Sequence, residues 1–492
     1  MTEREVVLRG GRVIDPESGV DAVLDVAIAR GQVVEIGTAL PPGQTDVDVG
    51  AMVVTAGFVD LHSHAQDIAG LRLQACDGVT TALELEAGIT PVDTAYRSAA
   101  AQGRPINYGF AASWALARME AVAGIELDGT LLPFLLNVAN PAWQRPAAQD
   151  QIAAMLARLS ADLADGAVGI GVLAGYAPAT DPQEYLRVAS LAADAGVPTF
   201  THSRDIREIV PDIVIDGADE IVRAAAETGA HMHYCHVNST SMRHIDRVLD
   251  AVERAQAEGA RISTEAYPYG SGMTAIGAAF LAPERLGERD LSPSSLTYAP
   301  TGERVANEAR LRELRQTDPG GLVIIHVLDD DDPADRPLLL RSLIIPGTVV
   351  ASDAMPLTWN APNPDPLAWP LPRAAVTHPR TAGTFSRAVR LLTREGGPFT
   401  LAEALSKCSL RPAQLLQDRV PAMARKGRLQ VGSDADIVIF DADTISDQAT
   451  YTNSTRRSTG IQHVLVNGTF VVRDGELATG VLPGQPVRAG PR

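Results

Sequence analysis

The residues of this chain best suited to metal chemistry are histidines and carboxylates that follow short apolar runs. The stretch GFVDLHSHAQD places His62 and His64 two residues apart, so on a strand both imidazoles point to the same side. The next apolar stretch, TTALELEAG, carries Glu84 and Glu86 with the same spacing. A buried carboxylate is costly unless it is paired, and a cation held by the two histidines would pair it. This spacing predicts the first half of a metal site.

Later apolar runs end in further residues of the same kind. His202 follows the run in PTFTHSRD, His236 ends HMHYCHVNS, and Asp353 follows four small apolar residues in VVASDAM. Each motif alone is weak evidence, because an isolated His-x-His pair is structural at least as often as it binds metal. The ordered set is stronger, since chance seldom places such residues at the ends of five successive strands. We expect His231 and His233 to support the ligands rather than to bind metal.

The elements that would position these residues are short apolar strands alternating with Ala- and Leu-rich helical stretches. This order predicts a parallel sheet with right-handed crossovers, and about eight such units predict a closed barrel. In such barrels the catalytic side chains project from the C-terminal ends of the strands. The runs LVIIH (322–326) and TVVASD (348–353) are predicted among the later strands. The Pro-rich stretch 362–372 is predicted to be a loop and is a candidate lid.

Both ends of the chain have a different pattern. Residues 1–55 alternate apolar and polar residues between Gly, Asp and Pro breaks, and residues 425–492 contain the hairpin dipeptides NG and DG. The sequence therefore predicts an α/β protein with a TIM (β/α)8 barrel over residues 56–424. A small β-sandwich domain would be built from both termini, residues 1–55 and 425–492.

Composition restricts the possible partners. The formal net charge of −18 argues against binding nucleic acid or an anionic membrane. No apolar stretch is long enough to span a membrane, and the opening MTEREVVLRGG lacks the apolar core of a signal peptide. The three cysteines are widely spaced and do not form a disulfide framework. We expect a cytoplasmic protein, and the sequence does not predict its oligomeric state.

Several motifs resemble those of the metal-dependent amidohydrolase superfamily, and the closest match is to the N-acyl-D-amino-acid deacylases. The resemblance lies in AGFVDLHSH, DGVTTALE, YPYGSG, THPRTAGTFSR and the C-terminal GSDADIVIFDADTISDQATYTNSTRRSTG. It covers most of the chain and is weakest between residues 280 and 345. It implies a TIM barrel with a small β-sandwich and one or two divalent metal ions, with zinc as the expected ion. The substrate would be a small-molecule or peptide amide.

The resemblance and the strand-end positions together give each residue a role. The expected metal ligands are His62, His64, Glu86, His202 and His236. Asp353 would take the proton of the attacking water and pass it to the leaving nitrogen, and Tyr269 would donate a hydrogen bond to the developing oxyanion. The further candidate substrate-binding residues are Asn238, Tyr269, Arg285, His378 and Arg380.

Two departures from the deacylase pattern affect these roles. The deacylases use a Cys near the end of the GVTT strand as a metal ligand, whereas this chain offers Glu86, with Glu84 as the alternative. A carboxylate is a harder ligand than a thiolate and would weaken strict selectivity for zinc. The deacylases also carry a Lys two residues after the last metal-binding His, where this chain has Asn238. Loss of that cation weakens the case for a simple N-acyl-D-amino acid as substrate.

Three functions remain open at this point. The leading one is a metal-dependent amidase acting on an N-acyl amino acid, with the D-configuration favoured by the resemblance. The second is an amidohydrolase that removes a follower peptide, or cleaves an amide, during maturation of a bottromycin-type peptide natural product. The third is a non-catalytic barrel that serves as a scaffold, against which the complete ligand set and Asp353 argue.

Overall fold

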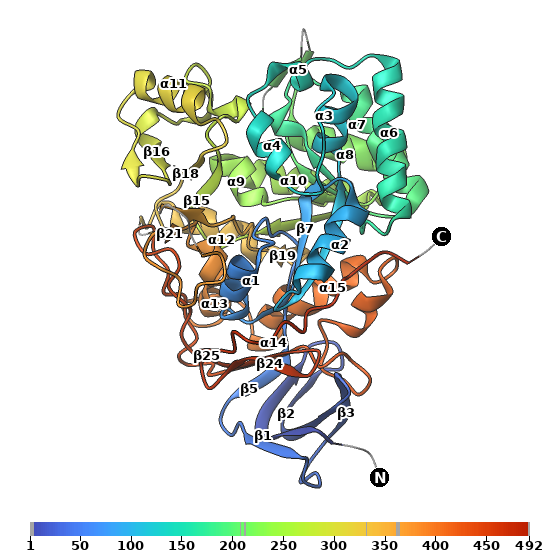
Figure 1. Cartoon of the computed structure of the whole chain (residues 1–492), viewed down its shortest axis with the longest axis vertical. Coiled ribbons are helices and arrows are strands. Elements are labelled where there is room, and N and C mark those ends of the chain that lie inside the picture. Colours follow the sequence, from blue (N-terminus) through green and yellow to red (C-terminus); the bar gives the residue numbers. More distant parts are fainter. Residues whose placement is uncertain (1–3, 207, 211–212, 331, 361–364, 491–492) are drawn as a thin grey trace.

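The fold consists mainly of a parallel barrel, formed by the middle of the chain, and a second sheet, formed by both ends of the chain (Figure 1). The computed structural model describes residues 4–206, 208–210, 213–330, 332–360 and 365–490. The beginning of the predicted Pro-rich loop, residues 362–364, lies outside the described residues. Among the described helices, none has the length and apolar character needed to cross a membrane.

The barrel is an eight-stranded sheet in which all neighbouring strands run parallel. Its order follows the chain: β6 (Phe58–Asp60), β7 (Val79–Ile89), β8 (Asn107–Ser113), β9 (Ile170–Leu173), β10 (Thr199–His202), β13 (Met232–Tyr234), β14 (Ile262–Ala266) and β19 (Thr348–Val350). Just beyond β6 and β19, Ser63 bridges to Ala354, whose carbonyl accepts from His64 N at 2.7 Å. These bonds join the first and last strands, and the predicted α/β class with a parallel barrel is confirmed.

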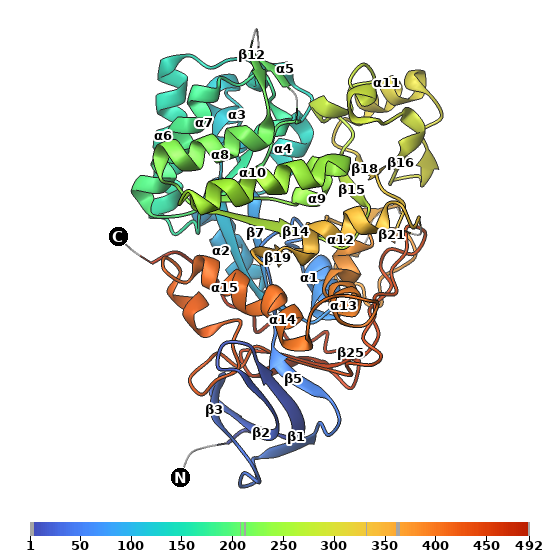
Figure 2. The same ribbon diagram turned by 180° about the vertical axis from the view of Figure 1, so that it is seen from behind.

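Helices cover the outside of the barrel (Figures 1 and 2). The helices between its strands include α1 (Ile68–Ala75), α2 (Val92–Gln102), α3 (Trp114–Ala123), α6 (Gln149–Ala164), α7 (Pro182–Ala195), α8 (Gly217–Thr228), α10 (Ile245–Ala257) and α12 (Arg336–Ile344). In α10 the buried residues Ile245, Val248, Leu249 and Val252 recur at the spacing of one helical face. That apolar face packs against the barrel and leaves the charged face to solvent.

One predicted barrel strand is wrong. The run LVIIH forms β18 (Leu322–His326), which pairs antiparallel with β15 (Ser271–Ala275) and β16 (Leu296–Tyr298) in a four-stranded sheet completed by β17 (Glu303–Arg304). This sheet and α11 (Glu308–Thr317) lie outside the barrel (Figure 1). The barrel strand in this part of the chain is β14, with the sequence ISTEA. A short apolar run does not reveal which sheet it joins, because that depends on its partners.

The second sheet has nine strands and takes them from both ends of the chain. The N-terminal strands are β1 (Val6–Asp15), β2 (Val20–Ala29), β3 (Gln32–Gly37), β4 (Thr45–Asp48) and β5 (Val53–Ala56). The C-terminal strands are β22 (Ile437–Phe440), β23 (Ile461–Val466), β24 (Thr469–Arg473) and β25 (Glu476–Leu477). The two sets meet where β5 pairs with β22, and a bridge from Gln32 to Asp434 brings the β3 edge back toward β22. Farther on, Pro483 and Pro486 bridge to Arg104 and Tyr108 beside the barrel.

Candidate active site

Five predicted ligands meet at the C-terminal ends of the barrel strands. Glu86, near the end of β7, lies at the centre of the cluster. Its Oε2 is 3.2 Å from His62 Nε2 and 3.6 Å from His64 Nε2. Its Oε1 is 2.6 Å from His236 Nε2 and 3.2 Å from His202 Nδ1. One carboxylate therefore faces two pairs of histidines, one pair with each oxygen.

Glu84 lies on the same strand but has a different role. Its Oε2 is 2.8 Å from His64 Nδ1, the ring nitrogen that faces away from the centre of the cluster. By accepting the Nδ1 proton, Glu84 leaves the lone pair on His64 Nε2 to point at the cluster. The structure therefore places Glu86 among the prospective ligands and Glu84 behind His64.

Glu265 plays the corresponding part for His62 and was not identified from the sequence. Its Oε1 is 2.5 Å from His62 Nδ1, and its Oε2 is 3.0 Å from His233 Nε2. All three residues are buried. Accepting the Nδ1 proton of His62 turns the Nε2 lone pair toward Glu86 and Asp353. The only sequence signal was an acidic residue inside the buried run ISTEA, a strand that the sequence analysis did not assign.

Replacing Glu265 with glutamine is expected to weaken metal binding about 10- to 100-fold, as is usual when the partner of a ligating histidine is removed. The amide keeps the size of the side chain, but its single oxygen can accept from only one of the two imidazoles, and its NH2 group faces the other. The measurement is the divalent-metal dissociation constant from chelator competition, with circular dichroism to verify the fold. Unchanged affinity would mean that the strand alone orients His62.

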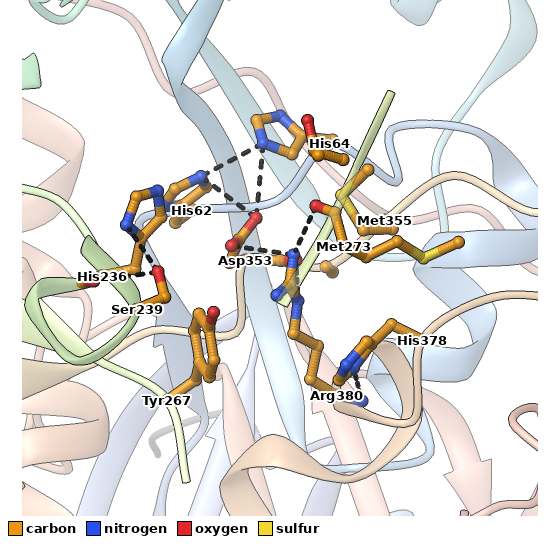
Figure 3. Close-up of polar contacts among 12 residues, drawn as sticks. His62, His64, His236, Ser239, Tyr267, Met273, Asp353, Met355, His378 and Arg380 are labelled. Atoms are coloured by element: carbon orange, nitrogen blue, oxygen red, sulfur yellow. Dashed lines mark hydrogen bonds and ion pairs between the residues drawn. The ribbon is translucent and has the colours of Figure 1, made fainter. Parts of the chain in front are cut away.

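Asp353 lies next to the cluster in an unusual backbone conformation, with φ of 49° (Figure 3). Its Oδ1 is 3.5 Å from both His62 Nε2 and His64 Nε2. Arg380, the first residue of α13 (Arg380–Thr393), holds the other side: Nη2 is 2.8 Å from Oδ2, and Nε donates to the Asp353 carbonyl at 2.6 Å. One oxygen is thus tied to Arg380, and the other faces the cluster.

Replacing Arg380 with methionine is expected to move the acidic limb of the kcat/KM profile to higher pH. Burial alone would raise the pKa of Asp353, but Arg380 and then His62 bring it below its usual value. Removing the positive guanidinium raises the pKa of Asp353. Because a base acts only when it is deprotonated, activity is then lost at a higher pH as the solution is acidified. The measurement is the pH profile of both proteins. Arg390→Met is the control, because Arg390 lies on the same helix as Arg380 but pairs with Asp447 and Glu395. An unmoved limb in the Arg380 variant would contradict the pairing.

The cluster has the donors that a divalent metal ion requires. Among the described residues, four groups of three side chains each place one ligand atom per residue within 4.8 Å of the others. Three of them are His62/His236/Asp353, His62/His64/Glu86 and Glu86/His202/His236, and the fourth is His62/Cys235/Glu265. Burial opposes charge on His62, yet Glu86 and Asp353 raise its pKa well above the usual value. Burial likewise opposes charge on Glu86, yet His62 and His236 lower its pKa well below the usual value. A bound cation would take the place of the protons that now offset these carboxylates.

Of the two tyrosines in YPY, Tyr267 lines the cavity, whereas Tyr269, the one predicted to contact the oxyanion, does not. Tyr267 lines the cavity at the cluster, with its ring 6.4 Å from that of His236 and 4.6 Å from the Arg380 guanidinium. Tyr269 packs instead under Arg387, at 4.5 Å, and beside His378. Tyr267 directly follows the last residue of β14, so its distance from the strand end would have identified it.

The remaining predicted substrate contacts lie beside the cavity rather than in it. Asn238 donates to the carbonyl of Tyr267 at 3.2 Å, so it supports that residue. His378 Nδ1 accepts from Arg380 N at 3.1 Å (Figure 3). Its Nε2 lies 2.9 Å from Ser271 Oγ. Arg285 is paired with Asp205 at 3.0 Å. Arg289, which the sequence analysis missed, does line the cavity.

The cavity at the cluster is mostly apolar, has a volume of about 90 Å³ and opens to solvent. The side chains of Phe134, Tyr176 and Phe280 line it on the side of His202, and those of Met273 and Met355 also contribute. Metal-type donors at one end and apolar walls above them suit a small substrate with apolar groups.

Comparison with known proteins identifies the class. A family model described as the amidohydrolase family matches residues 47–472. An N-acyl-D-glutamate deacylase and a D-aminoacylase, both from Alcaligenes xylosoxydans xylosoxydans, are 29% and 27% identical over 95% and 94% of this chain and 93% of theirs. The crystal structure of N-acyl-D-glutamate deacylase from Bordetella bronchiseptica, complexed with zinc and a phosphonate inhibitor, superposes with a TM-score of 0.75 at 24% identity. That match covers 99% of this chain and 100% of the other.

The chain belongs to the amidohydrolase family. It is a metal-dependent hydrolase that acts on C–N bonds, and the resemblance seen in its motifs is confirmed. The comparisons do not favour the follower-peptide or scaffold alternatives.

Proposed function

We propose that this protein hydrolyses N-acyl-D-amino acids with a divalent metal ion, zinc being the expected one. The observation that carries the proposal is the unpartnered, buried Nη1 of Arg380, which lies near Tyr267 Oη and Gly272 and which we interpret as a niche for a substrate carboxylate. The D-configuration rests on the names of the relatives, an N-acyl-D-glutamate deacylase and a D-aminoacylase. The zinc rests on the similar deacylase solved with that ion.

The niche offers an unused positive donor. Within the described part of the chain, Arg380 Nη1 is buried and has no hydrogen-bond partner. A Cβ on Gly272 would stand 3.2 Å from Tyr267 Oη and 3.7 Å from Arg380 Nη1. Glycine at this position leaves the space between the two groups free. A carboxylate there would accept from both, and Arg380 would supply the cation that Asn238 does not.

The hydrolysis follows from the positions of the side chains. When bound, a divalent ion at Glu86 and the histidines would polarise the amide carbonyl and lower the pKa of a water molecule. Asp353 Oδ1, which faces the cluster, accepts the proton of the attacking water and then protonates the leaving nitrogen. Arg380 holds Asp353 in position and, with Tyr267, anchors the substrate carboxylate. The products are a carboxylic acid and a D-amino acid.

The decisive experiment compares three substrates with the zinc-loaded protein: an N-acyl-D-methionine, its L-enantiomer and its C-terminal amide. We expect the free D-acid to be cleaved at least tenfold faster than the other two. The amide has no carboxylate for the niche, and the L-enantiomer would direct its carboxylate away from the niche when its amide lies at the cluster. Equal or faster cleavage of the amide would contradict the niche and favour a peptide-processing role.

Replacing Gly272 with alanine is expected to raise KM for the free acid about tenfold, since the added methyl group occupies the niche and displaces one charged hydrogen bond. KM and kcat for the free acid and for the amide form the readout. Gly287→Ala is the matched control, because a Cβ at Gly287 meets no atom within 4 Å. Equal KM values for Gly272→Ala and the unmodified protein would place the carboxylate elsewhere.

The predicted cytoplasmic location is kept as part of this proposal. It is supported by the three cysteines, which are all free and buried.

A further inference from the structure

We infer that the aromatic wall formed by Phe134, Tyr176 and Phe280 receives the acyl group of the substrate, and that the enzyme prefers large apolar acyl groups, such as phenylacetyl, over acetyl. This inference rests on the proposed function and adds to it the chemistry of the acyl half of the substrate.

The wall is a continuous set of buried rings that reaches the cluster. The Tyr176 ring centroid lies 5.3 Å from that of Phe134 and 5.2 Å from that of Phe280. It also lies 4.9 Å from the His202 ring, and the Phe280 ring is stacked on His202 with centroids 5.7 Å apart. An apolar group that touches this wall is therefore next to one of the prospective metal ligands.

The direction of the substrate follows from the carboxylate niche. The nitrogen of the scissile amide is one carbon away from the carboxylate, so the amine half must lie toward Arg380 and Asp353. The acyl substituent is bonded to the carbonyl carbon on the side opposite the nitrogen, so it points away from Arg380 and Asp353. Asp353 lies in one set of prospective ligands with His62 and His236, whereas His202 lies in a second set with Glu86 and the same His236. The acyl group consequently extends toward His202 and the aromatic wall.

A second apolar surface is available for the amino-acid side chain. Met273 and Met355 line the cavity near Arg380, and the Met273 carbonyl accepts from Arg380 Nη2 at 3.4 Å (Figure 3). These flexible thioethers lie at the amine end of the bound substrate. The two apolar surfaces thus contact different substituents, the methionines the side chain and the aromatic wall the acyl group.

The polar groups at the wall have partners, with the exception of Arg289 Nε, which is buried without one. The Tyr176 hydroxyl is 2.5 Å from Thr274 Oγ1. The Arg289 guanidinium lies 4.7 Å from the Phe280 ring and is 3.3 Å from Asp205. Apart from Arg289 Nε, the wall therefore presents ring surface, and an acetyl group is too small to cover three rings. A larger acyl group gains binding from each additional carbon it buries.

The test uses the zinc-loaded, unmodified protein with N-acetyl-, N-hexanoyl- and N-phenylacetyl-D-methionine. We expect kcat/KM to rise at least tenfold from acetyl to phenylacetyl. Equal values, or a preference for acetyl, would overturn the acyl assignment and leave the proposed function in place. No hydrolysis of any of the three would overturn the proposed function and the acyl assignment with it.

A variant locates the preference. In Phe134→Ala the ratio of kcat/KM for phenylacetyl to that for acetyl should fall about tenfold. The control is Leu136→Ala on the same helix, α4 (Leu132–Asn137), whose side chain is 67% exposed and should leave the ratio unchanged. Phe134→Leu provides a milder change if the alanine variant does not fold. A ratio unchanged in a folded Phe134 variant would overturn the assignment of the wall.

Discussion

Replacing Asp353 with asparagine is expected to lower kcat about a thousandfold while the protein still binds its metal. The amide cannot accept the proton of the attacking water, and general acid–base groups typically contribute 10²- to 10⁴-fold, so about that factor should be lost. Metal binding should persist because Glu86, His202 and His236 form a donor group without Asp353. The measurements are kcat with an N-acyl-D-methionine and metal content by elemental analysis of the same sample.

The pairing with Arg380 requires a control for this result. Asparagine would still accept from Arg380, so a loss of kcat in Asp353→Asn reports lost proton transfer more than a collapsed site. The Arg390→Met variant, altered on the same helix but away from Asp353, should keep its kcat. Turnover of Asp353→Asn within about threefold of the unmodified protein would remove Asp353 as the base.

Replacing Glu86 with alanine is expected to remove both the bound metal and the activity. Its two oxygens face different histidine pairs, so its loss takes one donor from the His62/His64 group and one from the His202/His236 group. It also leaves buried histidines without their carboxylate. We expect metal content close to zero after dialysis and turnover at the background rate, measured by elemental analysis and the hydrolysis assay.

Glu84→Ala is the matched control because Glu84 lies two residues away on the same strand. The Glu84→Ala variant should lose only the carboxylate that accepts from His64 Nδ1. Metal should therefore remain bound, with lower affinity. Metal retained by Glu86→Ala and lost by Glu84→Ala would exchange the roles that the geometry gives to the two carboxylates.

The sequence could predict the cluster because a parallel barrel turns a linear pattern into a spatial one. All strands end at the same rim, so His202 and His236, which follow different strands, had to come close together. The same argument applied to His62, His64 and Asp353. The sequence motifs in addition indicated the amidohydrolase family. The barrel and the sheet shared by the two termini were likewise visible in the alternation of strands, helices and hairpin dipeptides.

Side-chain partners that depend on packing between distant segments could not be predicted. Glu84 and Glu86 are equivalent by strand periodicity, and only their reach to opposite nitrogens of the imidazoles distinguishes them. Glu265 was missed because its strand was not assigned, while LVIIH was placed in the barrel although its partners are antiparallel.

The sequence by itself determined which residue types gather at the barrel rim, because strand order and periodicity set that placement. The tertiary structure decided which tyrosine faces the cavity, which carboxylate lies at the centre, and that Arg380 holds Asp353 from 27 positions away. It also brought Phe134, Tyr176 and Phe280 into one wall from three separate segments. The physical reason is that hydrogen bonds and ring contacts depend on distances of a few ångströms between segments, and only the folded chain defines those distances.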